Sequence, residues 1–232
     1  EVVDIVQQCC TAVLVHGDPA LIPLDETFAA AAKIADKIRY TGYVSSPISP
    51  DRHATKRNGV VVSIGGGAVG GPLLRCALAA RPFTRLRDAP WRLITGPNLP
   101  QADHQSLTAS ALTAPDGVTI ERFDPNFRTL LSRSAVSISQ AGYNTVMDVL
   151  ATHAPAILVP FAQGGETEQT VRAKLLALHR GFQFISEAEL SPDRLAAAVD
   201  EVADAVVGAP PASITALNQD GAAETAKIML DL

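Results

Sequence analysis

The stretch from Ser137 to Arg172 constrains the fold of this chain more than any other part of its sequence. An apolar run at 135–139 leads into small residues and a helical pattern at 144–152; a second apolar run at 156–159 precedes a polar, glycine-rich turn and another helix. Each helix therefore begins at the carboxyl end of a strand, where open α/β sheets bind their ligands. Because a helix amino end carries unpaired N–H groups and a positive dipole end, we expect an anionic ligand, most plausibly a phosphate. The segment predicts a nucleotide-binding domain.

The same alternation of strands and helices continues from Gly59 to the last part of the chain. Apolar runs that read as strands lie at 60–64, 91–95, 118–123, 135–139, 156–159 and 182–185. Helical patterns lie at 72–80, 101–112, 127–132, 144–152 and 166–177, and Ser191 opens a further capped helix. Six strands that alternate with helices predict an α/β fold with a doubly wound, Rossmann-like parallel sheet.

The first part of the chain does not fit this alternation. Strand patterns at 11–15 and 38–44 flank an alanine-rich helical pattern at 28–37, and a polar, proline-rich stretch follows at 45–58. So short a segment cannot build a core by itself. We therefore expect residues 1–44 to be the tail of an amino-terminal domain that is otherwise missing from the sequence, or else an appendage folded onto the main domain. We expect 45–58 to be a linker and 59–232 to be the nucleotide-binding domain.

Charge and composition exclude several classes of function. The net charge of −5, without a cluster of Lys or Arg, argues against a nucleic-acid-binding surface. Three cysteines provide no disulfide framework and indicate a reducing compartment, and no apolar run approaches the length that spans a bilayer. We expect a cytoplasmic protein with an ample hydrophobic core.

A glycine-rich loop follows the strand at 60–64. Gly65, Gly66 and Gly67 allow the backbone to approach a phosphate closely and to adopt positive φ angles. Together with Gly70 they match the dinucleotide-binding pattern, so an NAD(P)-dependent oxidoreductase is one interpretation. That interpretation requires an acidic residue at the end of the next strand, but Asp88 precedes that strand. The glycines can also serve only a tight turn between a strand and a helix.

Several motifs, in order, resemble the carboxyl-terminal, donor-binding domain of glycosyltransferase family 28, which has the GT-B fold. They are the glycine loop, Phe123 at a strand end, the segment Gln140-Ala-Gly142-Tyr-Asn144-Thr145-Val-Met-Asp148, the run Pro-Ala-Ile-Leu-Val-Pro at 155–160, and the pair Glu168-Gln169. The family includes the enzyme that adds N-acetylglucosamine to the lipid-linked peptidoglycan precursor. The resemblance runs from about Thr41 to the end of the chain and implies that residues 1–44 come from an acceptor-binding domain.

The resemblance implies a role for each of these residues toward a UDP-sugar donor. The glycine loop and the helix start from Gly142 through Asn144 to Thr145 would hold the diphosphate. Gln140, just before this helix start, would belong to the same donor site. Asp148 would accept hydrogen bonds from the ribose, although it also fits a first-turn acid that only stabilises the helix dipole. Phe123 would border the uracil, or else simply pack in the core.

The pair at the start of the next helix would contact the sugar. Gln169 can donate and accept hydrogen bonds with sugar hydroxyls, although it also fits an exposed residue at a helix start. The sequence departs from the family pattern in both the loop and the helix starts. Gly67 and Ala68 stand where the family's loop usually has Ser and Gln, Asp148 replaces the usual Glu, and Glu168 replaces Gln or His. The implied reaction is an inverting hexosyl transfer without a metal ion or cofactor, because the helix start would neutralise the diphosphate.

The general base and the partners remain open. His16 follows the first strand and is a candidate base, although it also fits an ordinary turn residue. The acceptor is unknown and can be lipid-linked, in which case the protein would work peripherally at the membrane, or a small molecule. Two further alternatives are a donor-binding subunit that is inactive without a partner chain and a UDP-N-acetylglucosamine 2-epimerase.

Overall fold

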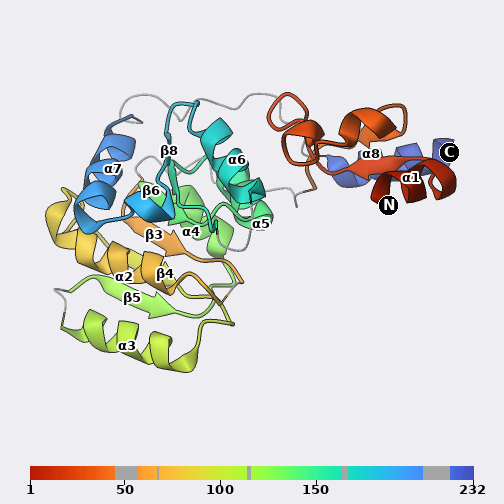
Figure 1. The fold of residues 1–232 in the computed structure, drawn as a ribbon. Helices are drawn as coiled ribbons and strands as arrows, with labels where there is room; N and C mark the ends of the chain where they lie inside the picture. The colour runs from red at the N-terminus through yellow and green to blue at the C-terminus, as the bar shows by residue number, and fades with distance from the viewer. Residues whose placement is uncertain (45–56, 67, 114–115, 163–166, 206–219) are drawn as a thin grey trace. The chain divides into compact units, whose positions relative to one another are not determined.

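The computed structural model describes residues 1–44, 57–66, 68–113, 116–162, 167–205 and 220–232 (Figure 1). Contacts divide the chain into two units. The larger unit comprises residues 48–213, and the smaller unit combines residues 1–47 with 214–232.

A six-stranded parallel sheet forms the centre of the larger unit. The strands follow the spatial order β5-β4-β3-β6-β7-β8, which is the order of a Rossmann-type doubly wound sheet. Their bounds are β3 (Val60–Ser63), β4 (Trp91–Ile94), β5 (Val118–Glu121), β6 (Val136–Ser139), β7 (Ala156–Leu158) and β8 (Phe182–Phe184). The predicted fold class and all six predicted strands of this unit are confirmed.

Helices connect the strands and cover both faces of the sheet (Figure 1). On one face α2 packs against α3 and α7, and elsewhere α4 packs against α5. Their bounds are α2 (Gly71–Ala80), α3 (Gln101–Leu112), α4 (Phe127–Arg133), α5 (Tyr143–Thr152), α6 (Glu168–Leu176) and α7 (Pro192–Ala205), with 3₁₀ turns η3 (Arg81–Phe83) and η5 (Glu187–Glu189). The predicted helix start at Glu166 lies outside the described residues.

The core lies between the central strands and the helices α2 and α7. β3 and β6 are buried along their whole length, as expected for parallel strands covered on both faces. Leu74 of α2 and Val199 of α7 are fully buried in this cluster. The indole nitrogen of Trp91, also buried, donates to the carbonyl oxygen of Leu86 at 2.9 Å, which satisfies its polar group.

The smaller unit contains a parallel pair of short strands and two terminal helices. Its elements are α1 (Val2–Cys9), β1 (Val13–Val15), η1 (Leu24–Glu26), η2 (Ala31–Ile34), β2 (Ile38–Tyr40) and α8 (Gly221–Asp231). The α-helix predicted at 28–37 is wrong, because only the 3₁₀ turn η2 forms there. Lys37, just after that turn, instead donates to the carbonyl oxygens of Val6, Gln7 and Cys10 at the end of α1.

The last helix belongs to the smaller unit. The amide nitrogen of Gly221 donates to the carbonyl oxygen of Tyr43 at 3.1 Å, and Val44 and Asp220 form an antiparallel bridge. A Cβ on Gly221 would lie 2.7 Å from the carbonyl oxygen of Gly42, so only glycine permits this close approach. The expected domain of 59–232 had placed this helix with the sheet, and the contacts instead group it with the beginning of the chain.

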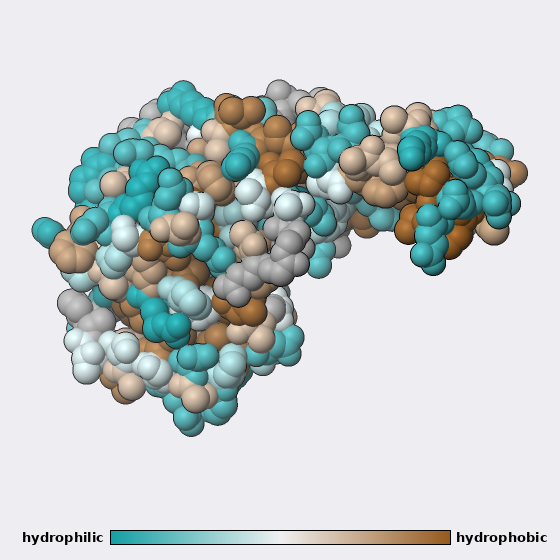
Figure 2. Space-filling view, in the orientation of Figure 1, coloured by the Kyte–Doolittle hydropathy of each residue, from teal (hydrophilic) through white to brown (hydrophobic). Residues whose placement is uncertain are grey.

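Both units expose apolar side chains among polar ones, as the patches in Figure 2 show. In the smaller unit most of the exposed large apolar residues lie on the two terminal helices and at the chain end, and one follows β2: Val2, Ile5, Met229, Leu230 and Leu232, and Val44. No helix in the described part of the chain is both long and apolar enough to span a bilayer.

Candidate nucleotide-binding site

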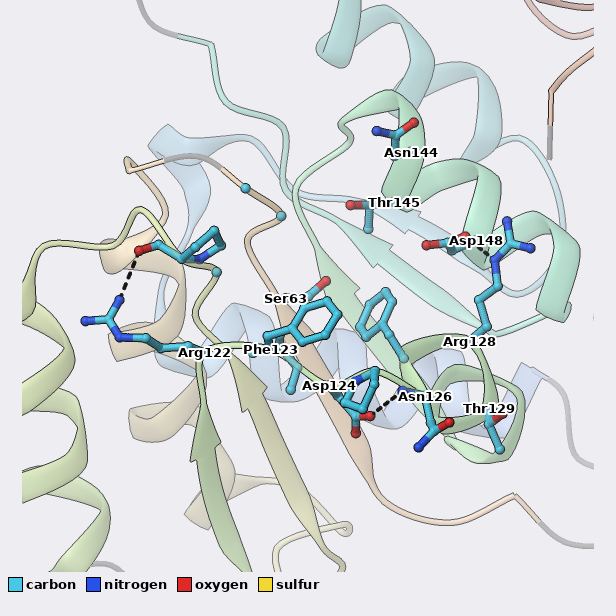
Figure 3. A pocket seen from close by; sticks show the side chains of 17 residues that line it. Ser63, Arg122, Phe123, Asp124, Asn126, Arg128, Thr129, Asn144, Thr145 and Asp148 are labelled. Atoms are coloured by element: carbon cyan, nitrogen blue, oxygen red, sulfur yellow. Dashed lines mark hydrogen bonds and ion pairs between the residues drawn. The ribbon is translucent and has the colours of Figure 1, made fainter. Parts of the chain in front are cut away.

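The strands β3 and β6 are neighbours whose connections leave in opposite directions. The chain passes from β3 to β4 on one side and from β6 to β7 on the other, which leaves a crevice at their carboxyl ends. A cavity of about 560 Å³ lies at this point, within the usual range of small-molecule pockets. Ser63, the last residue of β3, and Thr145 of α5 both line it (Figure 3).

The glycine loop forms one wall of the cavity. Gly65 has a φ of +65°, and Gly96, in the loop after β4, has a φ of +69°. A Cβ on Gly96 would lie 2.1 Å from the carbonyl oxygen of Gly65, so the two loops touch through their backbones. The side-chain amide of Asn98 donates to the carbonyl oxygen of Gly66 at 2.5 Å and fixes the loop further. Gly67 lies outside the described residues.

The amino end of α5 faces the glycine loop across the cavity. A Cβ on Gly65 would lie 3.6 Å from the hydroxyl oxygen of Thr145, which places the two segments in van der Waals range. Gly142 is the N-cap residue, and no side chain of the described residues caps this helix end. The first bond within the helix runs from the amide nitrogen of Val146 to the carbonyl oxygen of Gly142 at 3.0 Å. The amides before Val146 are therefore not used within the helix, as at the helix amino ends that bind anions. Asn144, in this turn, also lines the cavity.

Asp148 lines the cavity one turn further along α5. Its carboxylate accepts a hydrogen bond from the Nε of Arg128, in the first turn of α4, at 2.5 Å. Both side chains are about three-quarters buried. Figure 3 shows the Arg128 guanidinium beside one carboxylate oxygen of Asp148, while the other oxygen points toward the interior of the cavity.

The segment after β5 closes the opposite side. Phe123 lines the cavity and is 72% exposed, so it does not pack in the core as one interpretation of the sequence had it. Arg122 donates to the carbonyl oxygens of Pro97 and Leu99 at 3.2 and 3.1 Å, which ties this segment to the loop after β4. Phe123 is therefore an accessible aromatic ring on a well-anchored turn.

Gln140, Glu168 and Gln169 are not among the described residues that line this cavity. Gln140 instead borders a smaller hollow of about 230 Å³ beside Val69. Glu168 and Gln169 begin α6, and the side-chain oxygen of Gln169 accepts from the amide nitrogen of Phe161 at 3.3 Å. The expected roles of these residues toward the donor sugar remain predictions.

Arg172 connects α6 to the turn that precedes α5. It is only 5% exposed, and its Nη1 donates to the carbonyl oxygen of Ala141 at 2.7 Å. Its Nη2 forms an ion pair with Glu168, and its guanidinium lies 5.9 Å from the ring centroid of Tyr143. Arg172 therefore holds the strand-to-helix turn that leads into the amino end of α5.

His16 lies in the smaller unit, directly after β1. Its Nδ1 forms a hydrogen bond with the hydroxyl of Thr41, with 2.8 Å between the two atoms. The imidazole is exposed, whereas Thr41 is fully buried. The assignment of His16 as the general base remains a prediction.

The structure brings half of the expected residues to one cavity: Gly65, Gly66, Phe123, Asn144, Thr145 and Asp148. Ser63, Arg122 and Arg128 also line the cavity and were not predicted from the sequence. The position of Ser63 at a strand end signalled its place, but the pairing of Arg128 with Asp148 depends on the packing of α4 against α5. Among the described residues, no group of three or more His, Cys, Asp or Glu side chains is placed to hold a metal ion.

The cavity lies at the switch point of a doubly wound sheet, between a glycine turn and a helix amino end, which is where α/β domains of this class bind their ligands. Residues 61–220 match the model of the glycosyltransferase family 28 C-terminal domain. The chain belongs to this family, as the resemblance predicted.

Two relatives in sequence carry the same name, UDP-N-acetylglucosamine--N-acetylmuramyl-(pentapeptide) pyrophosphoryl-undecaprenol N-acetylglucosamine transferase. The protein of Polaromonas naphthalenivorans (strain CJ2) is 26% identical over 188 residues, which cover 74% of this chain and 49% of that protein. The protein of Lactiplantibacillus plantarum is 33% identical over 124 residues, which cover 53% of this chain and 34% of that protein. The chain thus spans half or less of the length of these relatives.

Solved structures show the same fold. The structure of CalG4, the calicheamicin glycosyltransferase, superposes on this chain with a TM-score of 0.64 at 18% identity. The superposition covers 95% of this chain and 51% of the CalG4 chain. The structure of MurG of Acinetobacter baumannii superposes with a TM-score of 0.54 at 18% identity. The superposition covers 99% of this chain and 77% of the MurG chain. The fold is that of GT-B glycosyltransferases.

Proposed function

We propose that this chain forms the donor-binding part of a glycosyltransferase that transfers a hexosyl group, N-acetylglucosaminyl in the first instance, from a UDP-sugar. The acceptor is a lipid-linked precursor or a small molecule, and the lipid-linked acceptor would bring the protein to the cytoplasmic face of the membrane. The cavity at the switch point carries the proposal, because it combines a helix amino end, a glycine loop, a carboxylate and an exposed aromatic ring. Membership of glycosyltransferase family 28 and the names of the relatives support the choice of reaction.

Each wall of the cavity then has a part in an inverting transfer. The acceptor oxygen forms a bond to the anomeric carbon, the bond from that carbon to the diphosphate breaks, and the acceptor proton passes to a base. The first-turn amides of α5 and the Thr145 hydroxyl would stabilise the charge that develops on the departing UDP. Asp148 would hold the ribose and Phe123 the uracil. We propose His16 as the base and a metal-independent reaction, so added EDTA should leave donor binding unchanged.

The oxidoreductase alternative has less support. In an NAD-binding site an acidic residue ends the second strand, where this chain has Thr95 and Gly96. Gly96 makes a backbone contact with the glycine loop and presents no side chain at all. A donor-binding part that needs another domain or chain for the acceptor is compatible with the exposed apolar residues of the smaller unit. We therefore expect donor binding by this chain without efficient transfer.

Calorimetric titration of the chain with UDP, UDP-N-acetylglucosamine and NAD tests the proposal. Binding of the two uridine nucleotides should weaken at least about tenfold in Asp148→Asn, because a carboxylate accepts hydrogen bonds more strongly than an amide. Asp193→Asn is the matched control, since Asp193 lies in the first turn of α7 and is exposed. Binding of NAD without UDP would overturn the proposal, and so would UDP affinity that is equal in the two variants.

A further inference from the structure

We infer that Arg128 determines how this site recognises ribose, by holding one oxygen of Asp148 so that the carboxylate accepts only one of the two ribose hydroxyls. The inference rests on the proposed function, because it assumes that the cavity binds a nucleotide. It assigns a role to a residue outside the motifs of the sequence, and it predicts tolerance toward deoxyribonucleotides.

The geometry of the ion pair separates the two carboxylate oxygens. The Nε of Arg128 donates to Oδ1 of Asp148 at 2.5 Å, which is a short, charge-assisted bond. In Figure 3 the other oxygen, Oδ2, points into the cavity, on the side of Thr145. No hydrogen bond within the described part of the chain uses Oδ2. The carboxylate therefore turns one oxygen toward a ligand in the cavity and the other toward Arg128.

The burial of the pair keeps this arrangement in place. The Arg128 and Asp148 side chains are only 28% and 22% exposed, so solvent screens their attraction less than it screens a surface pair. Arg128 extends from α4 and Asp148 from α5, and these two helices pack against each other. Because the aspartate side chain is short, it cannot turn both oxygens toward the cavity without giving up the bond to Arg128.

This arrangement has a consequence for the nucleotide. Two neighbouring ribose hydroxyls can donate to a carboxylate side by side, one to each oxygen, only when both oxygens face the ligand. With Oδ1 held by Arg128, one hydroxyl donates to Oδ2 and the other contributes little. A nucleotide that lacks the second hydroxyl should therefore bind almost as well as the parent compound.

The test compares UDP with 2′-deoxy-UDP and 3′-deoxy-UDP by calorimetry on the 232-residue chain. For the wild type we expect one deoxy analogue to bind at least about tenfold more weakly than UDP and the other within about threefold. A tenfold loss is about 1.4 kcal/mol, the size expected for one hydrogen bond to a charged group. In Arg128→Leu both oxygens of Asp148 become available, so both analogues should lose about tenfold relative to UDP.

Arg128→Lys is the conservative control. A lysine keeps the charge and an ammonium donor, so this variant should retain the wild-type tolerance for one analogue. If Arg128 served only to attract phosphate, Arg128→Leu would instead weaken all three affinities in parallel. Thermal melting without nucleotide verifies that each variant is folded. If the wild type loses equal affinity for both deoxy analogues relative to UDP, the inference is overturned. It is also overturned if folded Arg128→Leu still binds one deoxy analogue almost as well as UDP. Absence of UDP binding would instead overturn the proposed function itself.

Discussion

Ser63 and Ser139 lie side by side in register at the carboxyl ends of the two central strands, and neither buried hydroxyl has a hydrogen-bond partner among the described residues. Ser137, two residues earlier on β6, shares this property and faces the same side of the sheet. A buried hydroxyl without a partner costs free energy, so these serines do not stabilise the fold through hydrogen bonds. Of the three, Ser63 lines the cavity.

Replacement of Ser137 by Ala should leave the free energy of unfolding unchanged or raise it by up to about 1 kcal/mol, because the variant no longer buries an unpaired polar group. Ser134 is the matched control, since it is equally buried but donates to the carbonyl oxygen of Leu131 at 2.8 Å. Ser134→Ala should lower the free energy of unfolding by about 1 kcal/mol. Urea denaturation measures both, and equal destabilisation by the two substitutions would contradict the prediction.

Gly96→Ala should destabilise the larger unit by about 2 kcal/mol or more, because alanine disfavours the positive φ and its Cβ would collide with the carbonyl oxygen of Gly65. The same collision displaces the glycine loop, so UDP affinity should fall as well. Gly66→Ala is the control for stability, since its Cβ would meet nothing within 4 Å and its φ is not in the positive range. Thermal melting measures both variants. Equal melting temperatures would contradict the prediction that the backbone contact between the two loops leaves no room for a Cβ at Gly96.

Arg172→Met should weaken both stability and UDP binding. It removes the bond to the carbonyl oxygen of Ala141, whose loss should cost about 1.5–3 kcal/mol because the donor is charged and buried. The turn before α5 then loses its support. Glu168→Gln removes only the more exposed partner of the ion pair and should cost less than about 1 kcal/mol. Denaturation and UDP titration of the two variants separate these contributions, and a larger effect from Glu168→Gln would refute the role of Arg172 as the anchor.

Cys76 should react slowly with thiol reagents in the folded protein. Burial raises the pKa of its thiol from 9.0 to about 11, which reduces the thiolate fraction at pH 8 about a hundredfold. Iodoacetamide should therefore alkylate Cys76 at least about a hundred times faster in urea than in buffer, while the exposed Cys9 provides an internal reference in the same digest. The folded state favours the neutral thiol. The contribution of Cys76 to the free energy of unfolding is therefore fully present below pH 9 and is lost as the pH rises toward 11. Equal rates in urea and buffer would contradict this account.

Much of the larger unit was predictable from local pattern. The helix at 101–112 and all six strands of the sheet were predicted correctly, because buried parallel strands have continuous apolar runs and the helices between them have clear starts. The sequence predicted a ligand at the carboxyl ends of the strands, whereas the switch point between β3 and β6 became known only from the strand order in the structure. The exposure of Phe123 was one of two interpretations and needed the structure to decide it.

The smaller unit was less predictable because distant contacts determine its local structure. α1 begins with the β-branched Val2 and Val3 and was not predicted, and its terminal carbonyl groups are satisfied by Lys37 from beyond η2. The alanine-rich segment before Lys37 has high helix propensity, yet packing limits it to the short turn η2. The pairing of Arg128 with Asp148 was missed for the same reason, because it joins two helices through a contact that neither helix pattern shows.

The closeness of Gly65 and Thr145 has a consequence for how the folded state responds to its ligand. These residues belong to opposite halves of the sheet and come from distant parts of the chain, so the binding site exists only while β3 and β6 remain paired. A nucleotide that binds between them would act as a removable cross-link between the two halves. The melting temperature of the sheet should then rise with the logarithm of the nucleotide concentration once that concentration exceeds the dissociation constant.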